Sequence, residues 1–169
     1  MKKFNWILCG FLFAVFASCG YQFEGGGYIN KDVTRVAVNI LDNNSLQTEA
    51  GVVFTNALIR EIIEKTDTAV VDESHATAVI KGTINAITFS TLSRSTTESV
   101  IERRVCAVLD LRLVNKDGEM IWSVKDFATD EEYTVSEDNI EDENNIRDAV
   151  EKIATRSAEK VISRMLNNF

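Results

Sequence analysis

The chain has 169 residues, 26 acidic and 18 basic, and its formal net charge at pH 7 is −8. Such an acidic chain does not match the phosphates of nucleic acid, which need clustered Lys and Arg, so we exclude a nucleic-acid partner. The length suits one domain with a hydrophobic core, and the chain has no proline that could form a Pro-rich linker.

Residues 1–18 have the pattern of a removable export signal. Two lysines precede an apolar run over residues 7–17, which is shorter than the ~20 residues of a membrane-spanning helix. Small residues then lead into Cys19 and a glycine-rich stretch. Removing residues 1–18 would discard two lysines and no acids, so the net charge would change from −8 to −10.

Residues 16–19, Phe-Ala-Ser-Cys, resemble the lipobox of bacterial lipoproteins. That resemblance implies cleavage before Cys19, acylation of its thiol, and a lipidated tether over residues 19–32. The family's inner-membrane members often carry Asp after the cysteine, so Gly20 implies the periplasmic face of the outer membrane. An ordinary secretory signal with an incidental cysteine is the alternative. Cys106 would then be the one cysteine of the folded part, so no disulfide framework is expected.

The first half of the folded region predicts a strand, a helix and further strands. Residues 33–40 alternate as a strand, and residues 46–65 form a helix with a broad apolar face that begins at Leu46. A short strand is possible at residues 69–71, and a longer one is expected at residues 78–89.

The clearest element is a strand over residues 100–114. Its odd-numbered positions are mostly apolar, whereas Glu102, Arg104, Asp110 and Arg112 belong to the other face. Asp-Gly within residues 115–118 predicts a hairpin turn. Residues 120–133 form the partner strand. Three of its side chains are expected to point inward: Met120, Trp122 and Val124.

A final helix is predicted over residues 141–166, with a buried stripe that includes Ile153, Ser157 and Val161. We therefore expect residues 33–169 to form a single α+β domain. Its predicted architecture is a two-layer sandwich, in which a mostly antiparallel, mixed four-stranded sheet carries two helices on one face.

We find no catalytic or cofactor-binding constellation in the sequence. The one histidine, His75, lies in a polar loop, and no Gly-x-Ser-x-Gly elbow accompanies it. One histidine and one spare cysteine do not supply a zinc site. The acidic stretch 126–143 lacks the glycine of a calcium loop and is interpreted as a solvated loop that leads into a capped helix. We therefore expect that the protein is not an enzyme and that it needs no metal or cofactor.

Residues 90–99 link two long strands and contain seven Ser or Thr residues. They are either an ordinary polar loop or a contact surface in which Arg94 pairs with a phosphate.

Five stretches, in this order and spacing, resemble the lipopolysaccharide-assembly lipoprotein family LptE: residues 19–23, 33–45, 54–62, 76–84 and 110–122. The resemblance implies an outer-membrane lipoprotein that plugs a large β-barrel translocon of the LptD type. It implies roles in assembling that barrel and in delivering lipopolysaccharide to the outer leaflet, which are functions in outer-membrane biogenesis.

The resemblance also assigns roles to individual residues. Family members carry basic residues at hairpin tips that are associated with binding lipopolysaccharide, and Arg94 matches one such position. A second such place falls near residues 136–138, which are acidic here. The polar face of the strand at 100–114 is the expected barrel contact, through Arg104, Asp110 and Arg112.

Other classes of function stay open at this point. The opening strand and helix with residues 76–82 also resemble lipoproteins that activate a peptidoglycan synthase or form curli-type secretion pores. A pore would need long amphipathic membrane hairpins, and a synthase activator would need a long tether; neither is present. A periplasmic hydrolase lacks a nucleophile and base.

Overall fold

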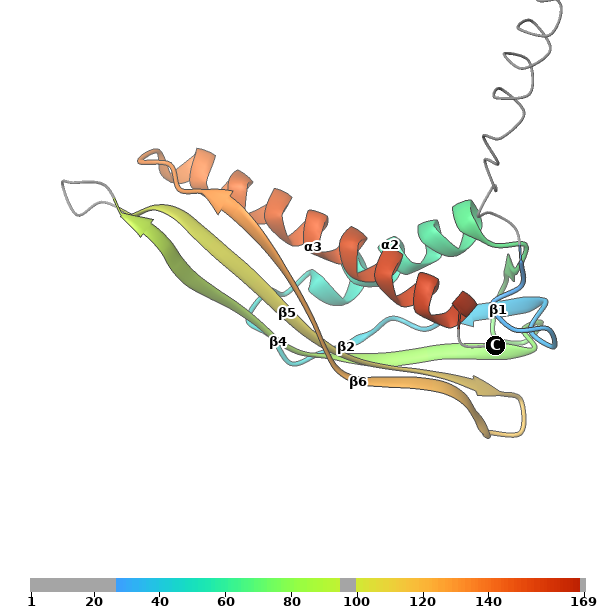
Figure 1. The fold of residues 1–169 in the computed structure, drawn as a ribbon. Coiled ribbons are helices and arrows are strands. Elements are labelled where there is room, and N and C mark those ends of the chain that lie inside the picture. Colours follow the sequence, from blue (N-terminus) through green and yellow to red (C-terminus); the bar gives the residue numbers. More distant parts are fainter. Residues whose placement is uncertain (1–26, 95–99, 168–169) are drawn as a thin grey trace, which may run out of the picture.

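The computed structural model describes residues 27–94 and 100–167, so Cys19 lies outside the described residues (Figure 1). Its strands and helices follow this order along the chain: β1 (Arg35–Val38), β2 (Asp42–Asn43), α2 (Ala50–Lys65), β3 (Ala69–Val70), β4 (Ala78–Arg94), β5 (Val100–Asn115), β6 (Met120–Thr134) and α3 (Asn139–Asn167).

The strands form one mixed sheet in the order β3-β1-β4-β5-β6, and β2 also pairs with β4. The three short strands run parallel to their neighbours, whereas β4, β5 and β6 form a long antiparallel meander. The predicted α+β class is confirmed. The sheet has six strands rather than four. β3 is the short strand considered possible at residues 69–71, and β2, with two residues, is too short to leave an alternating pattern.

Both helices cover the same face of the sheet, and they also pack against each other (Figure 1). α3 lies along β6, while α2 contacts the short strands and β4. Alternate residues of β5 from Val105 to Leu113 point into this layer and are buried, as the alternation in the sequence predicts. Ile101, predicted on the same face, lies at the start of the strand and is 40% exposed. The core therefore lies between the helix pair and one face of the sheet, and the opposite face carries no helix.

The helix α2 begins at Ala50, four residues later than predicted. The side chain of Asn43 organises the preceding turn: its Oδ1 accepts hydrogen bonds from the backbone N–H of Ser45 at 2.9 Å and from the Ser45 hydroxyl at 2.7 Å. This turn leaves Leu46 with 96% of its surface exposed, so the prediction that Leu46 belongs to the apolar face is wrong.

Two β-bulges bend the long strands on either side of β5 (Figure 1). One extra residue, Asn85, interrupts the register of β4, since Ile84 pairs with Leu109 but Ala86 pairs with Val108. The pairing of β5 with β6 shifts at almost the same level, near Asp126. Because bulges bend a strand and increase its twist, the sheet divides here into a half near the short strands and a half near the β4–β5 tip.

A further register shift reverses the predicted orientation of Met120. Trp122 pairs with Leu113 and is buried, but Met120 pairs with Val114, so the extra residue between them is Ile121. Met120 therefore lies on the helix-free face with 64% of its surface exposed, and its predicted inward position is wrong.

The packed part of the chain begins before the first strand. The backbone N–H of Ile29 donates to the Thr68 hydroxyl at 3.0 Å, and that of Asp67 donates to the carbonyl of Gly27 at 3.1 Å. Ile29 and Val33 are both buried. Residues 27–32 of the predicted tether are therefore part of the packed domain, and a flexible tether would extend no further than about Gly27.

Candidate functional site

The helix-free face of the sheet is the side that neither helix covers. Its centre is the even-numbered side of β5, which carries Arg104, Asp110 and Arg112, the three residues predicted to meet a partner. Arg104 and Arg112 are eight residues apart, which is roughly 26 Å along a strand. The structure thus places all three on one face, but in two separate clusters.

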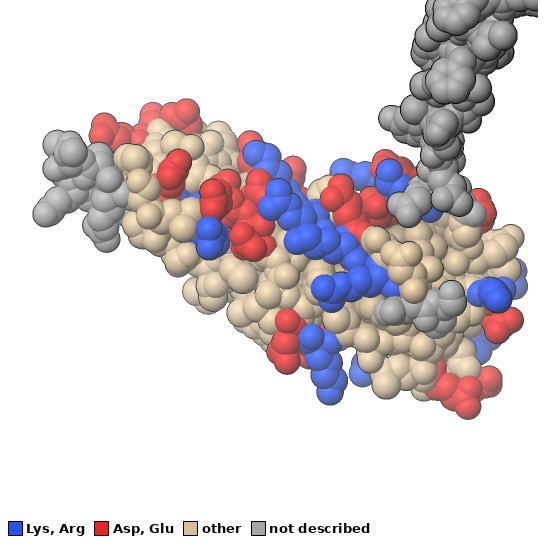
Figure 2. All heavy atoms as spheres, in the orientation of Figure 1, with Lys and Arg blue, Asp and Glu red and all other residues tan. Residues whose placement is uncertain are grey.

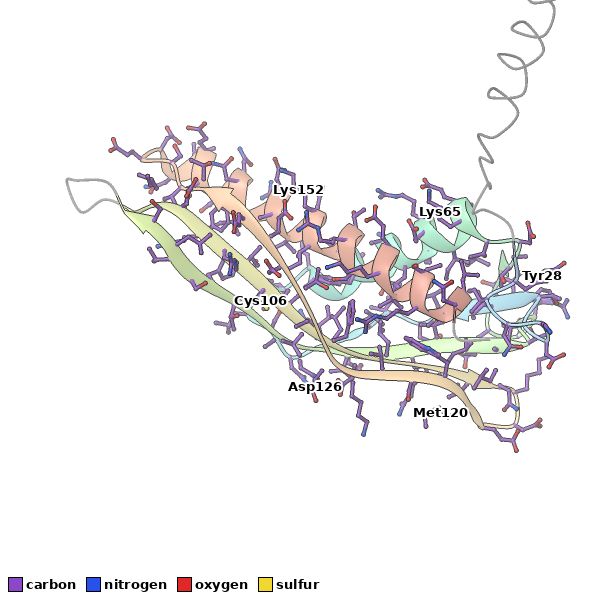
Figure 3. The ribbon with its side chains drawn as sticks, in the orientation of Figure 1. Tyr28, Lys65, Cys106, Met120, Asp126 and Lys152 are labelled. Atoms are coloured by element: carbon purple, nitrogen blue, oxygen red, sulfur yellow. The ribbon has the colours of Figure 1, made fainter. Side chains whose placement is uncertain are left out.

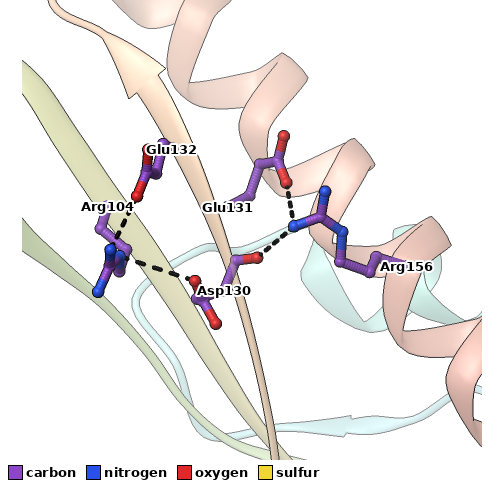
Figure 4. Close-up of polar contacts among 5 residues, drawn as sticks. All are labelled: Arg104, Asp130, Glu131, Glu132 and Arg156. Carbon is purple, nitrogen blue, oxygen red and sulfur yellow. Dashed lines mark hydrogen bonds and ion pairs between the residues drawn. The ribbon is translucent and has the colours of Figure 1, made fainter.

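Arg104 belongs to an ion-pair cluster in the half near the tip (Figure 4). Its Nη2 donates to Oε1 of Glu132, the residue directly opposite on β6, at 2.8 Å, and its Nε lies 3.7 Å from Oδ2 of Asp130. The hydrogen bond with Glu132 raises the pKa of the Arg104 guanidinium. Two carboxylates therefore already neutralise this cation, and the cluster as a whole carries a net negative charge.

A second arginine joins the same stretch of β6 to the helix layer (Figure 4). Arg156 of α3 forms an ion pair of 2.7 Å with Glu131, and its Nη1 donates to the backbone carbonyl of Asp130 at 2.9 Å. These contacts hold α3 along the free edge of β6. Their role is structural, because both partners lie within the domain.

Asp110 holds the bulge of β6. Its Oδ1 accepts a hydrogen bond of 2.8 Å from the backbone N–H of Asp126, whose φ is 50°. A non-glycine residue with positive φ costs conformational energy unless its surroundings hold it. The carboxylate of Asp110 supplies that support, so this residue has a local structural role in addition to its place on the helix-free face.

Arg112 lines a groove of about 500 Å³. Met120, labelled in Figure 3, lines the same groove. Arg112 stands directly opposite Lys81 of β4, and Lys125 of β6 also lines the groove. Like charges that face each other across two strands are destabilising. Lys81 has an ion pair of 3.7 Å with Glu73, whereas no ion pair among the described residues involves Arg112 or Lys125.

The rim of this groove is apolar and exposed. Ile40 and Met120 both line the groove, and 69% and 64% of their surfaces are exposed. The floor includes Gly82, where a Cβ would lie 2.4 Å from the carbonyl oxygen of Asp110. Asp42 and Asp110 also line the groove, so its three cations exceed its acids by one. This small positive excess beside apolar surface suits a partner that supplies carboxylate or phosphate oxygens together with apolar groups.

A basic ridge on α3 is a feature that the sequence reasoning missed. Figure 2 shows a band of Lys and Arg across the middle of the molecule, and α3 carries four exposed cations at a spacing of four residues: Lys152, Arg156, Lys160 and Arg164. That spacing aligns them on one side of a helix, and it was visible in the sequence. Arg164 lies 4.8 Å from the ring centroid of Phe127 in a cation–π contact, so it also holds α3 to β6.

The predicted tip position and the acidic loop lie at the same end of the molecule (Figure 1). Arg94 ends β4, and residues 95–99 lie outside the described residues. In the acidic loop, Asp138 Oδ1 accepts from the N–H groups of Ile140 and Glu141, and Ser136 Oγ donates to Oε2 of Glu141 at 2.6 Å. These acids cap α3, as the sequence predicts for a stretch that leads into a helix.

The described part of the chain shows no arrangement suited to catalysis. The Ser74 hydroxyl lies 3.0 Å from Nδ1 of His75, but both residues are exposed in a loop and no carboxylate is bonded to the ring there. Residues 27–94 and 100–167 contain no group of three or more His, Cys, Asp or Glu that could hold a metal ion. None of the helices in these two ranges is long and apolar enough to cross a membrane.

The fold is a two-layer α+β domain in which both helices cover one face of a mixed sheet. The chain belongs to the LptE family, described as lipopolysaccharide-assembly, whose family model matches residues 33–165. The family consists of lipoproteins that do not depend on a cofactor. No curated protein matches the sequence.

Solved structures share the fold at low sequence identity. A lipoprotein B from Nitrosomonas europaea is 16% identical, with a TM-score of 0.57, and the match covers 85% of this chain and 88% of that one. A lipoprotein from Caulobacter crescentus is 12% identical, with a TM-score of 0.56 and coverage of 75% and 88%. The rare lipoprotein B from Shewanella oneidensis is 13% identical, with a TM-score of 0.50 and coverage of 79% and 94%.

Proposed function

We propose that this chain is an outer-membrane lipoprotein that acts as the plug and assembly partner of an LptD-type β-barrel. In that role it helps to deliver lipopolysaccharide to the outer leaflet. Acyl chains on Cys19 would anchor it on the periplasmic side, since more than one chain gives stable membrane attachment. The role is one of binding and needs no catalysis.

One observation carries the proposal: a member of the lipopolysaccharide-assembly family leaves one face of its sheet free of helices, and beyond a small buried apolar cluster of Ala37, Ala76 and Val79 that face is charged. That face carries both signs, with Arg112 and Lys125 at the groove and Asp130 and Glu132 near the tip. The lumen of a large outer-membrane barrel is polar, so a face of mixed charge suits it better than it suits lipid.

The geometry favours Arg112 over Arg104 as the barrel contact. The charge of Arg104 is already matched by two carboxylates, whereas Arg112 and Lys125 have no acidic partner among the described residues. An unpaired cation gains more from a partner's carboxylate than a paired one does, because no existing bond must be broken. We therefore place the strongest electrostatic contact at the groove.

The test is purification of the tagged lipoprotein from its own host in mild detergent. A large β-barrel should co-elute in a fixed ratio, and depletion of the lipoprotein should leave that barrel misassembled and lipopolysaccharide stranded inside the cell. If depletion left barrel assembly and lipopolysaccharide transport normal but reduced peptidoglycan cross-linking, the data would support a synthase activator instead of this proposal.

Lipidation is tested separately. Mass spectrometry of the mature protein should show an acylated N-terminal Cys19, and Cys19→Ala should release the protein from the membrane or leave it uncleaved. An unmodified N-terminus beginning at residue 19 would refute the anchor without refuting the barrel contact.

A further inference from the structure

The second half of β4 is an open sheet edge. β1 and β2 pair with the first half, and the last described bond on that side runs from the N–H of Asn44 to the carbonyl of Ile84 at 2.9 Å. Beyond the bulge at Asn85, residues 86–91 pair in regular register with β5. No other strand pairs with them within the part of the chain that the structure describes. We call residues 86–91 the open edge segment.

The open edge segment lies between register irregularities at Asn85 and after Thr91, but within it the residues that usually protect an edge are missing. Its sequence, Ala-Ile-Thr-Phe-Ser-Thr, contains no charge, no proline and no glycine, and it is rich in β-forming residues. Six-residue segments of this composition are prone to pair with other strands. Thr88 and Ser90 are exposed, and Phe89 is only partly buried. An edge of this kind is a liability if nothing covers it.

The opposite edge of the same sheet shows how this protein protects a strand. β6 carries five charged residues: Lys125, Asp126, Asp130, Glu131 and Glu132. Side chains of α3 also occupy its outward carbonyls, since Arg156 donates to Asp130 O at 2.9 Å and the Asn145 amide donates to Thr134 O at 3.0 Å. The contrast between the two edges indicates that the open edge segment is kept free for pairing.

We propose that the open edge segment binds an extended, uncharged strand of the partner protein by β-augmentation. Main-chain hydrogen bonds would supply the affinity, and the uncharged side chains of the segment select a strand without charges. The edge adjoins the helix-free face, so a partner that meets that face can reach both surfaces. The partner in this inference is the barrel of the proposed function, so the identity of the partner rests on that function.

A second copy of the chain fits the segment less well. Two six-residue edges would bury far less than the roughly 1,200–2,000 Å² of a stable interface. The chain without residues 1–18 also carries a net charge of −10, which opposes self-association. A partner strand that forms part of a larger contact avoids both difficulties.

The first experiment is hydrogen–deuterium exchange on the purified lipoprotein alone and on its barrel complex. In a strand, successive N–H groups point to opposite sides, so about half of the amides in the segment face the open edge. They should exchange rapidly in the free protein and at least tenfold more slowly in the complex, while peptides from α2, in the helix layer, stay unchanged. A complex that forms without protection of residues 86–91 would overturn this inference and leave the proposed function standing.

Charged substitutions at the edge give a second readout. Thr88→Lys with Ser90→Lys should lower the amount of co-purified barrel at least tenfold, because charged side chains on an edge strand disfavour its pairing with another strand. Thr88→Asp with Ser90→Asp should have the same effect. The control adds the same charge to the helix layer through Thr48→Lys with Asn56→Lys, two exposed positions, and should leave the complex intact. An effect of one sign of charge only would overturn β-augmentation in favour of simple electrostatics.

A third experiment does not need the barrel. The probe is a capped, uncharged strand peptide of alternating Thr and Val, N-methylated on alternate residues so that it pairs through one edge only. Amide resonances of residues 86–91 should shift on titration, and the Thr88→Lys, Ser90→Lys variant should lose the response. No shift at millimolar peptide would refute the inference. Slow amide exchange of the segment in the free protein would also refute the inference. Exchange that slows with protein concentration would indicate pairing with a second copy, and exchange that speeds up when residues 19–26 are removed would indicate that these residues cover the edge.

Discussion

The carboxylate of Asp110 on β5 accepts a 2.8 Å hydrogen bond from the backbone N–H of Asp126, the one described non-glycine residue with positive φ. This bond joins the centre of the sheet to the bulge that bends its edge strand. Asp110→Ala should therefore lower the free energy of unfolding by about 1–2 kcal/mol, since it removes a charge-assisted bond to an N–H group at a strained position. Denaturant titration measures the change.

A matched substitution separates the bond from the strain. Asp126→Gly should be nearly neutral, because glycine adopts positive φ without steric cost and keeps the backbone N–H. If Asp110→Ala proved neutral while Asp126→Gly destabilised the protein, the bulge would be held by the Asp126 side chain and not by Asp110.

The close approach of β4 and β5 at the groove predicts that Gly82 tolerates no side chain. A Cβ at this position would lie 2.4 Å from the carbonyl oxygen of Asp110 and 2.4 Å from Cδ2 of Leu111. The backbone of β5 cannot move away from this Cβ without breaking its pairing with β4. Gly82→Ala should therefore destabilise the domain by about 1–3 kcal/mol. Gly27→Ala is the control, since no atom lies within 4 Å of its added Cβ, and thermal unfolding of both variants decides the matter.

The sequence predicted those parts of the fold in which a local pattern matches a buried surface. The alternation along β5 gave its two faces correctly, because burial on one side leaves a period of two over many residues. The apolar stripe of α3, with Ile153, Ser157 and Val161, was predicted for the same reason.

The errors arise where a single residue changes the register. An extra residue at Ile121 turns Met120 to the other face, and nothing in the local composition marks that bulge. The turn built by Asn43 delays α2 and exposes Leu46, although the apolar spacing continues through it. The groove could not be foreseen either, since its lining residues come from β2, β4, β5 and β6 and become adjacent only when these strands are paired.

Glu61 predicts a dependence of stability on pH. Burial raises the pKa of its carboxyl group above the ordinary value of 4.5, and Glu159 of α3 adds to the shift. A raised pKa in the folded state means that the protonated form is favoured by folding. The stability that Glu61 contributes is thus fully present below its unfolded-state pKa, and it is lost as the pH rises through the higher folded-state pKa.

Glu61→Gln should therefore raise the free energy of unfolding at pH 7. The gain should be about 0.5 kcal/mol, the scale of interactions between partly exposed charges. The difference from the unsubstituted protein should disappear as the pH falls below about 4, where the carboxyl is protonated in both states. Denaturant titrations at pH 7 and pH 3.5 give both values, and a gain of equal size at both would exclude ionisation as its cause.

The two arginines of the helix-free face should differ in their contribution to the barrel complex. Arg112 faces Lys81 across the strand pair and has no acidic partner among the described residues, whereas Arg104 is bonded to Glu132 and lies near Asp130. Reversal at Arg112 relieves a like-charge pair within the domain, so the isolated protein should stay folded and lose nothing measurable in thermal stability. If the groove meets acidic groups of the barrel, Arg112→Glu should reduce co-purified barrel at least tenfold, which corresponds to about 1.4 kcal/mol.

Arg104→Gln, which leaves the carboxylates of Asp130 and Glu132 exposed to solvent, should reduce co-purified barrel less than threefold. Lys116→Glu in the exposed hairpin turn controls for the change in net charge. Arg94→Glu should lower lipopolysaccharide binding and leave the barrel complex intact. Equal losses of co-purified barrel for the Arg104 and Arg112 variants would show that the barrel contacts the whole helix-free face and not the groove in particular.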